Sequence, residues 1–203
     1  MPVQTLTPKG RQTRTAIEQA AGKLFAERGF HGTTLADITS AAGKSPAVFY
    51  RYYTDKEDLL AALAESFLRD IVTPSGLSLH LPDSANGSEF FTSVVTGYWN
   101  MFKQNIGIMI AVAQLATTQQ RFAGVQNEFR RFGMDIVAAS VRRAQEQGHG
   151  TELDPEHTAA AIALLFENFT TVVVGRSSLG LEISDEDAIA TLSTIWKKTL
   201  YGF

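Results

Sequence analysis

The chain has 203 residues, enough for one large domain or two small ones built around a hydrophobic core. It contains no cysteine, which excludes a disulfide framework, a thiolate metal site and a cysteine nucleophile, and which fits a reducing cytoplasm. The net charge of −3 is unevenly spread: up to residue 60 there are eight basic against six acidic side chains, and the remainder has ten against fifteen. A basic N-terminal part on an acidic remainder is typical of a protein that touches phosphate at one end only.

Nothing in the sequence predicts a membrane partner. The N-terminus up to Gly10 lacks the apolar core of a secretory signal. The longest apolar stretch, residues 106–116, is too short to span a bilayer as a helix. We therefore expect a soluble protein of the cytoplasm.

The first part of the chain shows helical periodicity and almost no strand alternation. A first helix ends at Gly29, which is typical of a C′ glycine and is followed by the apolar Phe30. A second helix begins after Thr34, whose hydroxyl is a good N-cap, and it stops at Gly43.

Two more helices are expected before residue 73. The third begins after Ser45 with Pro46 in its first turn, where the missing N–H costs nothing, and it runs to about Tyr53. The fourth follows Asp55 as its cap and places apolar residues between Leu59 and Ile71 on its inner side. Because this fourth helix links the two parts of the chain, we expect it to transmit changes between them.

Residues 74–88 are rich in helix breakers and form the long loop of the chain. Leu77, Leu79 and Leu81 alternate there, but Pro82 argues against a strand. Later helices are expected at 89–104, 107–119, 121–147, 155–176 and 185–201. The predicted fold class is all-α with about nine helices: an N-terminal three-helix domain over residues 1–54 and a C-terminal helical bundle over residues 55–203.

The segment 33–56 has the layout of a helix, a glycine-bearing turn and a helix. If Ile38, Phe49 and Tyr53 face the core, helical spacing turns other side chains of the third helix outward. The outward residues are Pro46, Ala47, Tyr50 and Arg51. A short helix with small residues, a tyrosine and an arginine on its open face is suited to the major groove of DNA.

Over residues 11–60 the sequence resembles the N-terminal domain of the TetR family of bacterial repressors. The resemblance includes the first helix and the aromatic run at 49–53. It implies a helix-turn-helix that binds double-stranded DNA. It also implies a homodimer built through the last two helices and a C-terminal domain that binds an effector.

The resemblance also implies roles for single residues. Thr34 and the N–H groups that start the second helix would bind a phosphate, Tyr50 would hydrogen-bond another, and Lys56 would hold the flanking backbone. The residues that would face the bases are Ser45, Pro46, Ala47 and Val48. The alternative for Tyr50 is a merely packed aromatic side chain.

Three positions depart from the usual pattern of the family. Lys44 replaces a small aliphatic residue, Ala47 a frequent glycine and Arg51 a common histidine. The two cations either grip phosphate or contact a guanine, or they are solvated surface charges. The operator sequence is therefore not inherited from relatives.

The last two predicted helices are more apolar than a single buried stripe requires. We expect each to bury a second face against a symmetry mate, as the resemblance implies. Glu167 and Asn168 interrupt the apolar pattern, which indicates either polar groups that meet a ligand or a position at the surface or the dimer seam.

Aromatic and methionine side chains gather between residues 90 and 134, where they either fill the core or line an apolar cavity. The region 114–132 and the chain end are similar to the actinobacterial regulators of ethionamide resistance within this family, whose ligand channel is long and apolar. We expect a small apolar effector near Trp99, Phe102, Phe129, Glu167, Thr170 and Trp196.

Other classes of function find little support. His149, Glu152, Asp154 and His157 lie close in sequence, but the surrounding glycines and Pro155 predict a loop and a helix cap, not a metal site. No phosphate loop, nucleophile elbow or zinc-protease motif is present, so we expect neither an enzyme nor a cofactor.

The favoured hypothesis is a homodimeric repressor that binds a palindromic operator and is released by its effector. Two alternatives stay open. One is an architectural or activating DNA-binding protein without an effector. The other is a small-molecule binding protein whose N-terminal domain has lost its affinity for DNA.

Overall fold

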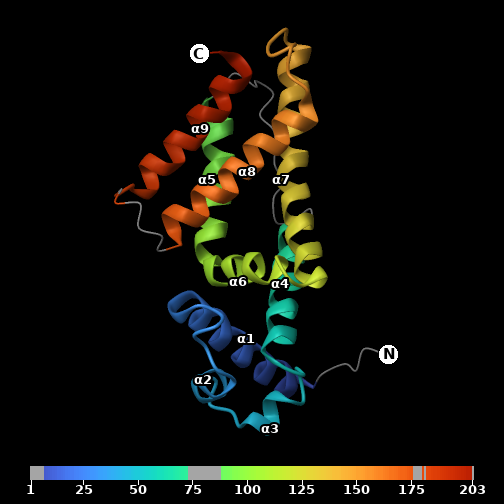
Figure 1. The fold of residues 1–203 in the computed structure, drawn as a ribbon, viewed down its shortest axis with the longest axis vertical. Helices are drawn as coiled ribbons and strands as arrows, with labels where there is room; N and C mark the ends of the chain where they lie inside the picture. Colours follow the sequence, from blue (N-terminus) through green and yellow to red (C-terminus); the bar gives the residue numbers. More distant parts are fainter. Residues whose placement is uncertain (1–6, 73–87, 176–179, 181, 203) are drawn as a thin grey trace. The chain divides into compact units, whose positions relative to one another are not determined.

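The structure is a computed structural model that describes residues 7–72, 88–175, 180 and 182–202 (Figure 1). Within this part every regular element is a helix, which confirms the all-α prediction. The nine helices of the described residues are α1 (Pro8–Arg28), α2 (Leu35–Ala41), α3 (Pro46–Phe49), α4 (Lys56–Val72), α5 (Ser88–Gln104), α6 (Ile106–Ala116), α7 (Gln120–Glu146), α8 (Pro155–Val174) and α9 (Asp185–Tyr201). The predicted loop with Leu77, Leu79 and Leu81 lies outside the described residues.

Side-chain caps set several of these helix starts. The Thr34 hydroxyl accepts a hydrogen bond from the N–H of Asp37 at 3.1 Å, and Asp55 accepts one from the N–H of Asp58 at 2.7 Å. These caps confirm the predicted starts of α2 and α4. Gly29 ends α1 with a φ of 74°, a left-handed conformation that glycine adopts without strain.

The prediction that the third helix runs to about Tyr53 is wrong, because α3 ends at Phe49. Beyond it the backbone tightens: Arg51 and Tyr52 donate to carbonyls three residues earlier, at 3.2 and 2.9 Å. Ser45 occupies the N-cap position as predicted, but its side chain makes no capping hydrogen bond. The i→i+3 bonds made by Arg51 and Tyr52 are common where a helix end turns sharply.

The chain divides into two compact units. The first unit comprises residues 1–69 and 107–125, and the second comprises residues 70–106 and 126–203. The predicted domain boundary after residue 54 concerns DNA-binding and ligand-binding roles, and it stays a prediction. By packing alone, most of α4, most of α6 and the start of α7 belong with the three N-terminal helices.

Helix α6 approaches α1 so closely that a glycine is needed at its start. A Cβ atom added to Gly107 would lie 2.3 Å from the backbone nitrogen of Ala26 and 2.6 Å from the carbonyl carbon of Phe25. Behind this contact, Ile108 of α6 joins a core shared with Ile17. The lack of a side chain at one position thus lets α6 cover the helix-turn-helix core.

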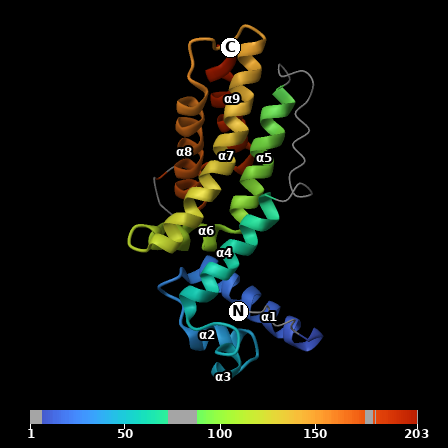
Figure 2. The ribbon, with the colours of Figure 1, turned by 90° about the vertical axis from the view of Figure 1, so that its right-hand side faces the viewer.

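The second unit is a bundle of α5, α8, α9 and most of α7 (Figures 1 and 2). Its core cluster includes Trp99, Phe91, Val141, Phe166 and Trp196. The buried indole N–H of Trp196 donates to the Ser140 hydroxyl at 3.1 Å, which satisfies its polar edge. The predicted C-terminal helical bundle is therefore present in the second unit.

Of the described helices, α8 alone is long and apolar enough to cross a bilayer by length and composition. Ala159, Ile162 and Phe166 on one of its faces belong to the core cluster of the second unit. Leu164 and Leu165, on another face, are exposed. The apolar excess of α8 is thus divided between a packed face and an open one.

We expect Gly107→Ala to lower the free energy of unfolding of the protein by about 1–3 kcal/mol, because the new methyl group overlaps the backbone of α1. Denaturant titration followed by circular dichroism measures this change. Gly124→Ala is the matched control: Gly124 is exposed on α7 in the same unit, and a Cβ there meets nothing within 4 Å. It should raise stability by up to about 1 kcal/mol, and equal effects of the two changes would contradict the close contact.

Candidate nucleic-acid interface and ligand cavity

The orientation of α3 follows from which aromatic side chains are buried. Phe49 is 0% exposed and Tyr53 is 4% exposed, whereas Tyr50 is 60% exposed. This confirms the predicted inward and outward faces. Of the other predicted DNA-binding residues here, Ser45, Pro46, Ala47 and Arg51 are exposed and Lys44 and Val48 are half-buried.

A polar network connects α1 to the end of the recognition turn, by which we mean α3 and the turn that follows it, residues 45–53. The Tyr53 hydroxyl donates to Oε1 of Glu18 at 2.6 Å, and Arg14 Nε donates to the same oxygen at 2.9 Å. Burial raises the pKa of Tyr53 above its ordinary value, and the Glu18 carboxylate raises it further. Tyr53 therefore stays a neutral donor, and the recognition turn is fixed by a hydrogen bond as well as by packing.

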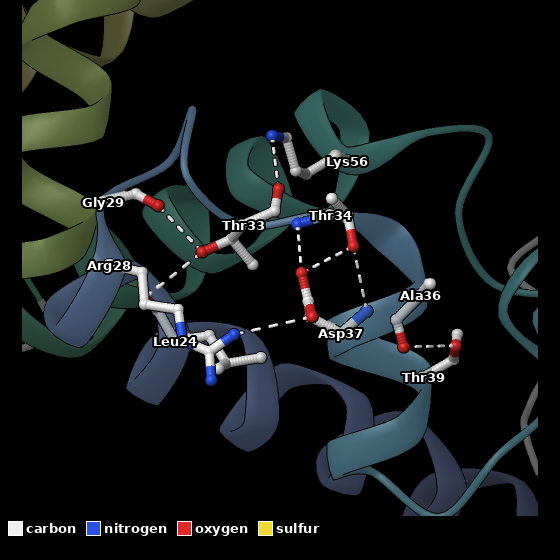
Figure 3. Close-up of polar contacts among 9 residues, drawn as sticks. All are labelled: Leu24, Arg28, Gly29, Thr33, Thr34, Ala36, Asp37, Thr39 and Lys56. Atoms are coloured by element: carbon white, nitrogen blue, oxygen red, sulfur yellow. Dashed lines mark hydrogen bonds and ion pairs between the residues drawn. The ribbon is translucent and has the colours of Figure 1, made fainter.

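At the start of α2, Thr34 and Asp37 form a capping box (Figure 3). The Thr34 hydroxyl and its backbone N–H both donate to Oδ2 of Asp37, at 2.5 and 2.8 Å. These two hydrogen bonds, and then the charge of Arg28, lower the pKa of Asp37 below its ordinary value of 3.8. The phosphate contact predicted for Thr34 stays a prediction, and its own N–H and hydroxyl proton are already engaged.

Lys56, at the first position of α4, is held inside the first unit (Figure 3). Its ammonium group donates to the carbonyl oxygens of Phe30 and Thr33 at 2.6 and 2.7 Å, and lies 4.2 Å from the centroid of the Phe30 ring. Partial burial lowers the pKa of Lys56. An ammonium has three N–H bonds, so a phosphate contact by Lys56 stays a prediction that would use the third.

The second unit contains a cavity of about 70 Å³ with mainly apolar walls. Its lining comes from α5, α7, α8 and α9. Of the six residues predicted to bind a ligand, Phe129, Glu167 and Trp196 line it. Trp99, Phe102 and Thr170 are instead buried in the packing of the unit.

The cavity lining contains an ion pair. Arg130 binds Glu167 with two hydrogen bonds, Nε to Oε2 at 2.6 Å and Nη2 to Oε1 at 2.9 Å. Gln126 Nε2 donates to the same Oε1 at 2.9 Å. Glu167 is thus satisfied by the protein, which answers why an acidic residue interrupts the apolar α8.

Tyr98, from α5, also lines the cavity and carries a buried hydroxyl. Burial raises its pKa above the ordinary value, and the nearby Thr170 hydroxyl partly opposes the rise. Neither hydroxyl makes a hydrogen bond of ordinary geometry in the described part of the chain. Two buried hydroxyl groups without such a partner indicate unused hydrogen-bonding capacity beside the cavity.

Tyr98 and Arg130 line the cavity although neither is predicted from the sequence as a ligand-binding residue. Tyr98 lies in the region 90–134, whose aromatic side chains were predicted either to fill the core or to line an apolar cavity. No spacing in the sequence identifies Arg130 as the partner of Glu167, because the two residues are 37 positions apart in the chain.

The cluster at 149–157 does not have the geometry of a metal site. Asp154 is the N-cap of α8 and accepts from the N–H of His157 at 2.8 Å. Among the described residues, no group of three or more His, Cys, Asp or Glu side chains is arranged to hold a metal ion.

A helix-turn-helix with an open aromatic face, together with a helical bundle that contains a cavity, defines the class of DNA-binding transcriptional regulators. Residues 17–63 match the model of the bacterial regulatory proteins of the tetR family. Over these residues the chain therefore has the DNA-binding domain of the TetR family of transcriptional regulators, as the resemblance implied.

Relatives and solved structures agree over nearly the whole chain. The HTH-type transcriptional regulator EthR of Mycobacterium tuberculosis is 21% identical over 199 residues, covering 98% of this chain and 92% of that protein. A regulator from Saccharomonospora viridis, solved in complex with choline, superposes with a TM-score of 0.78 at 19% identity, over 94% of this chain and 98% of that one. FadR from Bacillus subtilis, solved with stearoyl-CoA, gives 0.66 at 19% identity, over 93% and 98%. The solved structures support the fold.

We expect Thr34→Ala to raise the pKa of Asp37 toward 3.8, because it removes the bond from the Thr34 hydroxyl, the largest cause of the lowering, while the backbone N–H bond remains. Arg28→Ala should raise it less, since the Arg28 charge is the smaller cause. A carboxyl-detected NMR titration measures both values. Because the folded pKa is lowered, the capping box stabilises the protein above about pH 4, and this contribution disappears as the pH falls through the lowered value. An equal rise in both variants would contradict the capping box as the main cause.

Proposed function

We propose that the protein is a repressor that binds a palindromic operator as a homodimer in the cytoplasm and leaves it when a small apolar effector occupies the cavity of the second unit. The observation that carries the DNA-binding part is the 60% exposure of Tyr50 beside buried Phe49 and Tyr53. This arrangement gives α3 an open face suited to a major groove.

The proposed DNA contacts divide into two kinds. Phosphate contacts come from Tyr50, from Lys56 and from the N–H groups near Thr34, and they position the protein. Base contacts come from Ser45, Pro46, Ala47 and Val48, mostly through van der Waals contact with thymine methyl groups. Lys44 and Arg51 add charge beside this face, so they are the positions where the operator preference of this protein departs from that of its relatives.

The proposed dimer forms through α8 and α9. Three large apolar side chains of these helices are open to solvent in one chain: Leu164 is 48% exposed, Leu165 is 40% and Ile195 is 38%. A self-complementary contact between two copies buries such residues on both sides of a two-fold axis. A palindromic operator mirrors that axis.

The cavity supports an effector over an architectural role without one. The neighbours crystallised with choline and with stearoyl-CoA have the same fold and take up small molecules. Release follows if the effector prefers a dimer geometry in which the two recognition turns no longer match successive major grooves. Nearly complete release requires a preference of about 5 kcal/mol.

We expect Tyr50→Phe to weaken operator binding at least about tenfold, because the change removes a hydrogen bond to phosphate in each half-site. The operator is first selected from a random DNA pool, and a palindrome is the expected product. Fluorescence anisotropy at fixed salt then measures the affinity.

Tyr52→Phe, at a half-buried position of the same aromatic run, is the matched control and should change the affinity by less than about twofold. Unchanged specific binding by Tyr50→Phe would show that Tyr50 is not part of the interface.

Lys56→Met tests the phosphate contact proposed for Lys56. If Lys56 contacts phosphate, the slope of log affinity against log salt falls by roughly two per dimer; an unchanged slope confines Lys56 to its internal contacts.

We expect Leu165→Arg to convert the dimer into a monomer at micromolar concentration, because it places an unpaired charge in an apolar interface. Sedimentation equilibrium measures the mass in solution. Asn127→Arg, which adds the same charge at an exposed position of α7, is the control and should leave the dimer intact. A monomeric wild-type protein would contradict the proposed homodimer, and a dimer that survives Leu165→Arg would place the interface elsewhere.

A further inference from the structure

The cavity of the second unit combines apolar walls with one ion pair. The charged side chains in its lining are Arg130 and Glu167. Its volume of about 70 Å³ has room for roughly five to seven water-sized groups. A molecule that fits the cavity as it stands therefore has a short carbon body.

The charge of the lining is balanced. Arg130 and Glu167 are joined by two hydrogen bonds of 2.6 and 2.9 Å, so their opposite charges neutralise each other. A ligand with a charge of its own would be transferred from water to a site that offers no opposite charge. The ion pair therefore disfavours both an ammonium group and a carboxylate.

The hydrogen-bonding groups that the protein leaves unused around the cavity are donors. Glu167 already receives three N–H bonds from Gln126 and Arg130, which fill most of the roughly four acceptor positions of a carboxylate. Arg130 spends two of the five N–H bonds of a guanidinium on Glu167. The Tyr98 hydroxyl is buried beside Thr170, and even if Thr170 donates to it, the phenolic proton needs an acceptor.

We propose that this cavity binds a small uncharged molecule with a short carbon body and a carbonyl-type hydrogen-bond acceptor. Arg130, oriented by Glu167, donates to that acceptor, and Tyr98 supplies a second donor. The inference rests on the proposed function, in which the same cavity holds the effector, and it adds the chemical class of that effector.

The test compares three probes with seven non-hydrogen atoms each: 2-hexanone, pentanoate and n-hexylammonium. Binding to the full-length protein is followed by NMR through the indole N–H of Trp196, which lines the cavity. The indole of Trp99, which is not part of the lining, is the internal reference. We expect the ketone to bind about tenfold more tightly than either charged probe, since neither charge finds a partner.

Variants of the lining residues test which side chains recognise the ligand. Arg130→Met leaves Glu167 unpaired, so it should weaken 2-hexanone about tenfold and make n-hexylammonium the preferred probe. Glu167→Gln leaves the guanidinium unpaired and should make pentanoate the preferred probe. Tyr98→Phe keeps the ring and should weaken the ketone about threefold. Arg131→Met, at an exposed neighbouring position of α7, is the control and should change none of these values.

A charged probe that binds the wild-type protein as tightly as 2-hexanone overturns the inference. So does a failure of all three probes to bind, or a ketone affinity that Arg130→Met leaves unchanged. Operator affinity is measured on the same samples. If the probe order is as expected but operator binding does not respond, the inference stands and ligand release fails; if no probe binds and operator binding persists, the inference alone fails.

Discussion

The burial of Phe49 and Tyr53 is the constraint on which the DNA-binding part of the molecule depends. Helix α3 has four residues, too few to hold a helical conformation by its own hydrogen bonds. Its direction is therefore set by the two aromatic rings in the core and by the hydrogen bond from Tyr53 to Glu18 on α1. Tyr50 is exposed as a consequence of that anchoring.

The same core reaches well beyond the helix-turn-helix. Lys56 bonds the carbonyls of Phe30 and Thr33, which fastens the start of α4 to the turn before α2. Gly107 allows α6 to rest on the backbone at the end of α1. A change in the direction of α4 or α6 therefore acts on the elements that hold the recognition turn.

Local signals in the sequence account for what could be predicted. Caps such as Thr34 and Asp55, and the aromatic spacing at 49–53, act within one or two helical turns, so helix starts and the faces of α3 follow from them. The end of α3 at Phe49 does not follow from such local signals. The partners of Lys56, the contact at Gly107 and the Arg130–Glu167 pair join residues that are far apart in the chain, and no periodicity encodes such pairings. For the cavity, apolar composition indicated a region, while the side chains that line it depend on packing.

The division of the first unit into residues 1–69 and 107–125 has a consequence for biosynthesis. Translation proceeds at about 5–20 residues per second, and domains fold as their last segment emerges. The N-terminal helices therefore leave the ribosome well before Ile108 and Phe122, which complete their core. During that interval part of their apolar surface stays uncovered. A nascent chain arrested before α6 should consequently be a client for chaperones, although it already contains the whole helix-turn-helix.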